Sequence, residues 1–281
     1  MRLARRPWSS ALLLLLLHAA APGIHAAKLT LLQFPTCNAS LPPFDLRALT
    51  VLVRTSGATY PSRHASVERW AAPLRDAGAH VTLFSVSPVE GRVSLPLVVD
   101  ALRFGEHSQL SELRVQHAWL ARHAPRGTRL ILKVDDDSEV HAGRLAAALA
   151  CYAAEAVGGG DAGDDEGGDK RGAALRHAPL LGACAVWESE PVPFCDGGAG
   201  YLFSRRHVAL FLLCRGTEAL EDVAISLCLA RAGVPLMNHP HFHRAADVAG
   251  DPQWITRHKV VRRERLRRRS RGALSSASTA A

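Results

Sequence analysis

One stretch limits the folds open to this chain more than any other: an apolar run that ends in three consecutive carboxylates. Residues 130–134 are mostly apolar with a β-branched share, and Asp135, Asp136 and Asp137 follow directly. Such a run is typical of a buried strand. Because side chains alternate faces along a strand, we expect Asp135 and Asp137 on one side and Asp136 on the other. That pair could hold one hard cation, which takes oxygen ligands and keeps positions open for water or phosphate.

The alternative for this stretch is a solvated acidic turn that caps a helix beginning near His141. Carboxylates are favourable at a helix N-terminus without any metal. The stretch alone leaves both interpretations open.

The segments before and after this run alternate between strand-like and helix-like patterns. Strands are expected at 49–55, 80–86 and 180–187, and helices at 63–77 (capped by Ser62), 108–123, 141–156, 204–215 and 218–233. This βαβα alternation predicts a mostly parallel sheet covered by helices. In open sheets of this type, ligands bind at the carboxyl ends of the strands. Thr55 lies at the carboxyl end of one expected strand, and the three aspartates lie at the carboxyl end of another. This placement favours the metal interpretation.

Three glycines stand within the four positions 197–200, just before an apolar segment. Glycine permits a close backbone approach to a ligand and backbone angles closed to other residues. A phosphate-binding P-loop is disfavoured because no Lys-Ser/Thr pair follows. The alternative is a tight turn before a buried strand.

Two further groups of residues are candidates for chemistry. Glu221 and Asp222 open a helix, where the helix dipole alone would favour acids, and the functional alternative is a general base. Histidines concentrate late in the chain, including His243 and His258, and we expect one of them to be a metal ligand.

The two ends of the chain have distinct compositions. Residues 1–26 combine early arginines, an apolar core and a small residue suited to cleavage, which predicts a signal peptide or a short signal anchor. The remainder is therefore expected in the lumen of the secretory pathway. A glycosylation sequon at Asn38 agrees with that address. Six cysteines allow fifteen pairings, of which we expect Cys184–Cys195.

Most of the formal charge of +8 lies in one tail. Residues 262–271 hold seven arginines and one glutamate, so the body of the protein is nearly neutral and is not expected to bind nucleic acid. We expect 262–281 to be a disordered basic tail. The glycine-rich acidic residues 158–172 are expected to be a disordered insert within a folded domain at 48–260, not a second metal site.

Five motifs, in this order, resemble the inverting β-1,3-glycosyltransferases (the galactosyltransferase family) of the GT-A fold. The nearest resemblance is to their Fringe-like and β-1,3-glucosyltransferase-like branch. The motifs are Val51-Leu52-Val53-Arg54-Thr55 with Arg63 and Glu68-Arg69-Trp70, Lys133-Val134-Asp135-Asp136-Asp137, Gly197–Ser204, Glu221-Asp222-Val223, and Pro240–Ala245 with Trp254–Lys259. The resemblance implies a single α/β domain with a Rossmann-like, mostly parallel central sheet flanked by helices.

The resemblance also implies a division of roles. Mn²⁺ would be held by Asp137, with Asp135 assisting and His258 completing the set; His243 is the alternative. A UDP-sugar would contact Thr55 and Arg63 as well as Asp135 and Asp136, with Thr55 at the uracil and Arg63 at the phosphates. Asp222 would be the catalytic base, with Glu221 as the fallback.

The implied activity is metal-dependent transfer of a hexose or N-acetylhexosamine from a UDP-sugar to a hydroxyl of a glycan acceptor, with a β-1,3 linkage as the product. The acceptor would be protein-linked or lipid-linked. The protein would reside in the Golgi or endoplasmic reticulum, and an uncleaved N-terminal anchor would make it a type II membrane protein. The alternative is a non-catalytic lumenal relative that binds a glycan or nucleotide sugar.

Overall fold

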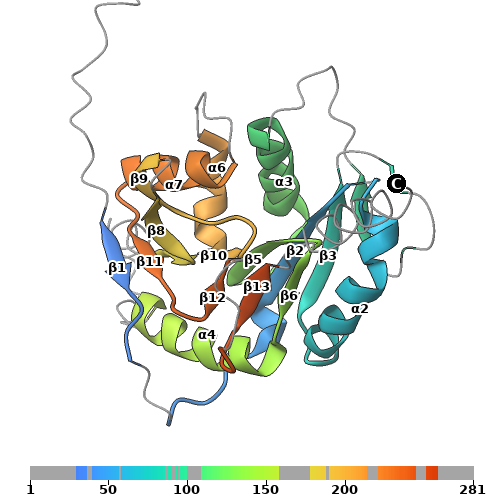
Figure 1. Ribbon diagram of the computed structural model, residues 1–281, viewed down its shortest axis with the longest axis horizontal. Coiled ribbons are helices and arrows are strands. Elements are labelled where there is room, and N and C mark those ends of the chain that lie inside the picture. The colour runs from blue at the N-terminus through green and yellow to red at the C-terminus, as the bar shows by residue number, and fades with distance from the viewer. Residues whose placement is uncertain are drawn as a thin grey trace, which may run out of the picture.

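The structure is a computed structural model that describes one α/β domain (Figure 1). The described residues are 30–36, 40–56, 58–85, 88–89, 93, 95–99, 109–157, 178–187, 190–213, 221–244 and 251–258. The expected signal segment 1–26, the sequon at Asn38, the acidic insert 158–172 and the tail 262–281 lie outside these residues. A bilayer-crossing helix needs a long apolar stretch, and none of the helices within the described ranges has one.

The centre of the domain is an eight-stranded sheet with the order β1-β11-β7-β10-β5-β2-β3-β4. Its strands are β1 (Leu31–Gln33), β2 (Leu49–Thr55), β3 (His80–Ser85), β4 (Leu97–Val99), β5 (Leu130–Asp135), β7 (Leu180–Gly182), β10 (Tyr201–Ser204) and β11 (Leu236–Asn238). Strand β10 is antiparallel to both of its neighbours, and the remaining pairs are parallel. The prediction of a mostly parallel sheet is confirmed.

Helices cover both faces of this sheet (Figure 1). The helices are α2 (Tyr60–Asp76) and α4 (Ala142–Val157) on one face, and α3 (Gln109–His123), α6 (Val208–Leu213) and α7 (Glu221–Arg231) on the other. Alternate residues of one strand serve the two cores: Val51 and Val53 pack with α2 and α4, whereas Leu52 packs with α3, α6 and α7. Strands buried on both faces explain the continuous apolar runs in the sequence. This architecture is the one expected of a GT-A-type domain.

A small second sheet stands beside the carboxyl end of β5. It contains β12 (Phe242–His243), β13 (Thr256–His258) and β6 (Ser138–Val140). Strand β6 begins directly after the aspartates, so a two-residue turn joins the large sheet to the small one. The antiparallel register of β13 and β6 sets His258 opposite Ser138. This register brings a residue from the end of the domain next to the aspartates.

The predicted strand at 180–187 is wrong in one respect, because it is two strands in different sheets. Strand β7 belongs to the central sheet, whereas β8 (Cys184–Trp187) pairs with β9 (Glu190–Cys195) in a hairpin. The hairpin register places Cys184 opposite Cys195, and the disulfide between them confirms the expected pairing. Cys151 and Cys228 are disulfide-bonded as well.

Helix boundaries also differ from the predictions. Helix α2 begins at Tyr60 with Thr59 at its N-cap, so Ser62 lies inside the helix and is not the cap. Pro61 explains the earlier start, because its fixed φ suits a first helical turn. The segment after Ser204 opens as a 3₁₀ helix (Arg205–His207) before α6 begins.

Candidate active site

The aspartates separate as the strand alternation predicts. Asp135 ends β5, and Asp136 and Asp137 form the turn that follows. Asp135, Asp137 and His258 each offer a ligand atom, and these atoms all lie within 4.8 Å of one another. The His258 Nε2 atom is 3.0 Å from Asp137 Oδ1. We call these three residues the carboxylate site.

Asp137 and His258 each favour the charged form of the other. Burial alone would raise the pKa of Asp137, but the hydrogen bond and charge of His258, together with Arg63, hold it below its ordinary value. The hydrogen bond to Asp137 raises the pKa of His258. Arg63 Nη2 stands 3.4 Å from Asp137 Oδ2. The carboxylate of Asp137 therefore stays ionised near neutral pH and is available to a cation.

Asp136 points to the other side and is buried. Its carboxylate accepts hydrogen bonds from the hydroxyls of Thr55 at 2.6 Å and Thr59 at 2.9 Å, and it forms an ion pair with Arg63. Asp136 thus ties the Asp turn to β2 and to the start of α2. The structure brings Thr55, Arg63 and Asp136 into mutual contact, and their contact with a nucleotide stays a prediction.

The alternative of a helix-capping acidic turn does not fit the structure. Strand β6 separates the aspartates from α4, which begins only at Ala142. The ring of His141, not a carboxylate, accepts from the backbone N–H of Arg144 in the first turn at 3.4 Å. Helix capping therefore does not explain the position of the three carboxylates.

Lys133 is a buried cation beside the carboxylate site that the sequence reasoning did not assign to it. Its Nζ donates to Asp135 Oδ1 at 2.8 Å and lies 3.4 Å from Glu221 Oε1. Burial would lower the pKa of Lys133, but the charges of Asp135 and Glu221 outweigh it and raise the pKa. The strand period offered a signal, since residues i and i+2 share a face.

The glycine motif forms a turn at 197–199, and two of its glycines, Gly198 and Gly200, are needed for space or for backbone angle. A Cβ on Gly198 would lie 2.5 Å from His258 Nδ1, so only glycine leaves room for that ring. Gly200 has φ +83°, and a Cβ there would lie 2.8 Å from Val134 Cγ1. The Ser138 hydroxyl donates to the carbonyl of Gly198 at 2.7 Å, which holds the turn against β6. The close backbone approach that these glycines permit is thus an approach to His258 and to strand β5.

The two adjacent acids of α7 have different surroundings. Glu221 is buried; it accepts from the Tyr201 hydroxyl at 2.6 Å and faces Lys133 and, at 3.8 Å, Arg54 Nε. The hydroxyl of Tyr201 and the two cations hold the Glu221 carboxylate within the fold. Glu221 therefore suits a structural role beside the site.

Asp222 is half-buried and reaches the glycine turn. Its two carboxylate oxygens accept backbone N–H groups, from Gly197 at 3.0 Å and from Val223 at 3.0 Å. Burial raises the pKa of Asp222, although both backbone hydrogen bonds oppose that shift. A carboxylate held in one orientation with a raised pKa has the properties of a general base.

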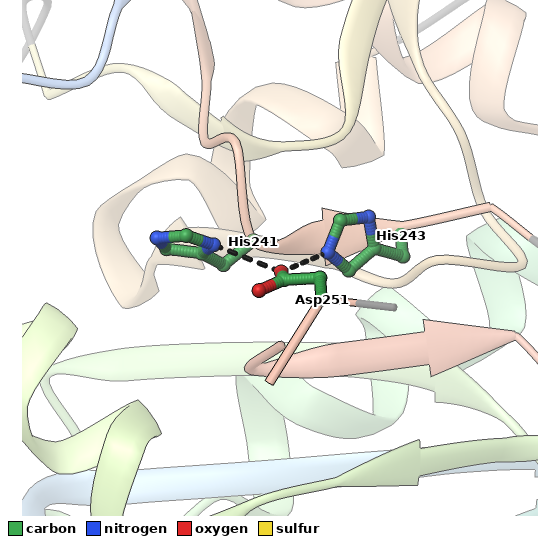
Figure 2. A group of neighbouring side chains, drawn as sticks. All are labelled: His241, His243 and Asp251. Carbon is green, nitrogen blue, oxygen red and sulfur yellow. Dashed lines mark hydrogen bonds and ion pairs between the residues drawn. The ribbon is translucent and has the colours of Figure 1, made fainter. Parts of the chain in front are cut away.

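The structure brings His258, and not the alternative His243, to the aspartates. The His243 Nε2 atom lies 2.5 Å from Asp251 Oδ2, and His241 Nδ1 lies 3.0 Å from the same oxygen (Figure 2). No pattern in the sequence pointed to Asp251.

Comparison with known proteins gives a distant relationship. No protein-family model matches the chain. A β-1,3-glucosyltransferase of Homo sapiens is 27% identical over 125 residues, which cover 43% of this chain and 21% of that protein. A β-1,3-glucosyltransferase of Mus musculus is 26% identical over 130 residues, or 45% of this chain and 23% of that protein. The match thus spans less than a quarter of each curated relative. The chain is distantly related to glycosyltransferases, and this similarity does not single out the Fringe-like branch.

Proposed function

We propose that this protein is an inverting, metal-dependent glycosyltransferase. It moves a hexose or N-acetylhexosamine from a UDP-sugar to a hydroxyl of a glycan acceptor and forms a β-1,3 linkage. The observation that carries the proposal is the arrangement at the glycine turn: Gly198 packs on His258 of the carboxylate site, and Gly197 binds Asp222. A cation site and a basic carboxylate are thereby held on one short turn. The distant similarity to two β-1,3-glucosyltransferases supports the same class.

The donor set of the carboxylate site fits Mn²⁺. Two carboxylates and one imidazole offer oxygen and nitrogen ligands of the kind this ion accepts. Asp137, Asp135 and His258 would hold the ion, which when bound would act as a Lewis acid and neutralise charge on the departing diphosphate. Arg63 lies beside Asp137 and is proposed to meet the phosphates, with Thr55 near the uracil.

Asp222 supplies the base. The acceptor hydroxyl gives its proton to a carboxylate oxygen of Asp222 as its own oxygen attacks the anomeric carbon of the donor. The bond to the diphosphate breaks in the same displacement, so the anomeric configuration inverts without a covalent enzyme intermediate. The N–H groups of Gly197 and Val223 fix the orientation of the carboxylate during this step. Glu221 remains the fallback base.

The cellular setting is part of the proposal. The N-terminal pattern at 1–26 supports entry into the secretory pathway, either by a cleaved signal or by an anchor that contacts the membrane. The disulfide Cys184–Cys195 suits that oxidising compartment, Golgi or endoplasmic reticulum. The acceptor is proposed to be a protein-linked or lipid-linked glycan.

Release of UDP from a panel of UDP-sugars by the purified chain tests this function, with Mn²⁺ and with a chelator. We expect slow release from one donor, dependent on Mn²⁺ and lost in Asp137→Asn. Calorimetry with UDP should show binding that requires Mn²⁺. Binding without release from any donor, with a series of glycan acceptors present, would instead favour the non-catalytic lumenal relative. The absence of both UDP binding and UDP release would overturn the assignment of this site.

A further inference from the structure

A second group of metal-ligating side chains lies outside the carboxylate site. His241 Nδ1 and His243 Nε2 approach one oxygen, Oδ2 of Asp251, at 3.0 Å and 2.5 Å. Figure 2 shows the carboxylate between the two rings, with a ring nitrogen of each turned toward it. The three ligand atoms all lie within 4.8 Å of one another. We call these three residues the histidine cluster.

The ligands of the histidine cluster are held in place by the backbone around them. His243 is in β12, which pairs with β13 through Phe242↔Thr256 and His243↔Arg257. The backbone N–H of His241 donates to His239 Nδ1 at 3.1 Å. Asp251 uses its other oxygen, Oδ1, to accept from the backbone N–H of Gln253 at 2.7 Å. One carboxylate oxygen is thus occupied by backbone, and the other is aimed at the two imidazoles.

We infer that the histidine cluster binds a second divalent metal ion, with Zn²⁺ preferred over Mn²⁺. Two imidazole nitrogens and one carboxylate oxygen are a recurring three-ligand zinc set, with the fourth position of the tetrahedron left to water or another ligand. Borderline-soft imidazole ligands favour zinc and its late first-row neighbours, whereas oxygen-rich sets suit manganese. Binding uses the lone pairs of His241 Nδ1 and His243 Nε2, so any proton on these atoms moves to the other ring nitrogen or to solvent.

The ion would act as a clip on the closing part of the domain. His241 and His243 come from the segment at β12, and Asp251 precedes β13. One ion bound to all three would tie these two segments together at a point beside the β12–β13 pairing. The inference does not depend on the proposed transferase activity, because it concerns different residues and a different ion.

Zinc stoichiometry tests the inference on the full chain. Wild type and variants are stripped with chelator, titrated with Zn²⁺ to saturation in the presence of excess Mn²⁺, and assayed for bound zinc. We expect one tightly bound Zn²⁺ in the wild type and in Asp137→Asn. We expect a loss of at least about tenfold in zinc affinity in Asp251→Asn and in His241→Gln. Both changed side chains are partly exposed, at 20% and 32%, which favours variants that still fold.

Matched controls and a spectroscopic readout complete the test. Asp76→Asn and His123→Gln make the same two chemical changes at exposed positions and should keep wild-type zinc binding. Co²⁺ in place of Zn²⁺ should give the visible absorption of a tetrahedral site in the wild type and lose it in Asp251→Asn. Equal zinc affinity in the wild type and both cluster variants would overturn the inference. Loss of the tight zinc in Asp137→Asn alone would also overturn it.

Discussion

The carboxylate site and the histidine cluster are built from the same residue types, yet their surroundings differ. Around the carboxylate site stand two cations: Lys133 bonds Asp135, and Arg63 lies 3.4 Å from Asp137. A cation-rich edge of a parallel sheet suits an anionic ligand such as a diphosphate. In the histidine cluster the carboxylate of Asp251 is instead flanked by two imidazoles. The surroundings of the carboxylate site suit the proposed turnover of an anionic substrate. Those of the histidine cluster suit the retention of a metal ion.

Strand register, and not residue type, separates the two groups. Strands β12 and β13 are parallel neighbours, and His243 stands opposite Arg257, one residue before His258. Each strand carries one histidine to a different carboxylate. The spacing of histidines in the sequence could not reveal which of them meets Asp137, because the pairing of β13 with β6 decides it.

The largest expected effect on turnover comes from a change at Asp222, because it should stop sugar transfer and leave metal binding at both groups intact. Asp222→Asn should lower Mn²⁺-dependent turnover of the donor by about 10²- to 10⁴-fold, the usual contribution of a general base. Affinity for UDP and Mn²⁺ should change little, because Asp222 is not a member of the carboxylate site. Zinc binding at the histidine cluster should be unaffected. Steady-state release of UDP and calorimetry measure these quantities.

Two variants serve as controls for this prediction. Asp76→Asn makes the same change at an exposed position and should keep wild-type turnover. Glu221→Gln removes the carboxylate that faces Lys133, so its main effect should be on thermal stability. Retained turnover in Asp222→Asn together with its loss in a folded Glu221→Gln would assign the base to Glu221 instead.

Local patterns predicted the parts of the site that are close in sequence. The two-residue period of β5 predicted that Asp135 and Asp137 share a side away from Asp136, and the structure confirms it. The contact between Lys133 and Glu221 joins residues far apart in the chain, and no local pattern encodes it. Strands β6, β12 and β13 have two or three residues each, too few for an alternation to be recognised. The position of His258 beside Asp137 depends on those short strands.

A smaller effect is expected from the glycine turn, and it tests whether the carboxylate site depends on close packing. Gly198→Ala places a Cβ 2.5 Å from His258 Nδ1, so the ring or the glycine turn must shift from its present position. Displacing one ligand in this way should weaken Mn²⁺ binding by about 10- to 100-fold. Gly127→Ala is the matched control, because a Cβ there meets nothing within 4 Å. Equal Mn²⁺ affinity in both variants would show that Mn²⁺ binding does not depend on this close packing.

The smallest expected effect is a shift in the pH dependence of turnover. It distinguishes Asp222 from Asp137, whose pKa values move in opposite directions. Burial raises the pKa of Asp222 above its ordinary value of 3.8, whereas His258 and Arg63 outweigh burial and lower that of Asp137. The base acts in its ionised form, so turnover at saturating Mn²⁺ should fall on acidification at a pH above 3.8. An acid limb at or below 3.8 would contradict the assignment of Asp222.

The two carboxylates should also have opposite effects on the free energy of unfolding. Asp222, with a raised pKa, contributes stability that is fully present below 3.8 and is lost as the pH rises through its folded pKa. Asp137, with a lowered pKa, contributes stability that is present above 3.8 and is lost as the pH falls through its folded pKa. Urea unfolding across this range, compared between wild type and Asp222→Asn, measures the first contribution. The ionised form of Asp222 that the proposed mechanism requires is therefore the form that folding disfavours, as expected of a partly buried functional carboxylate.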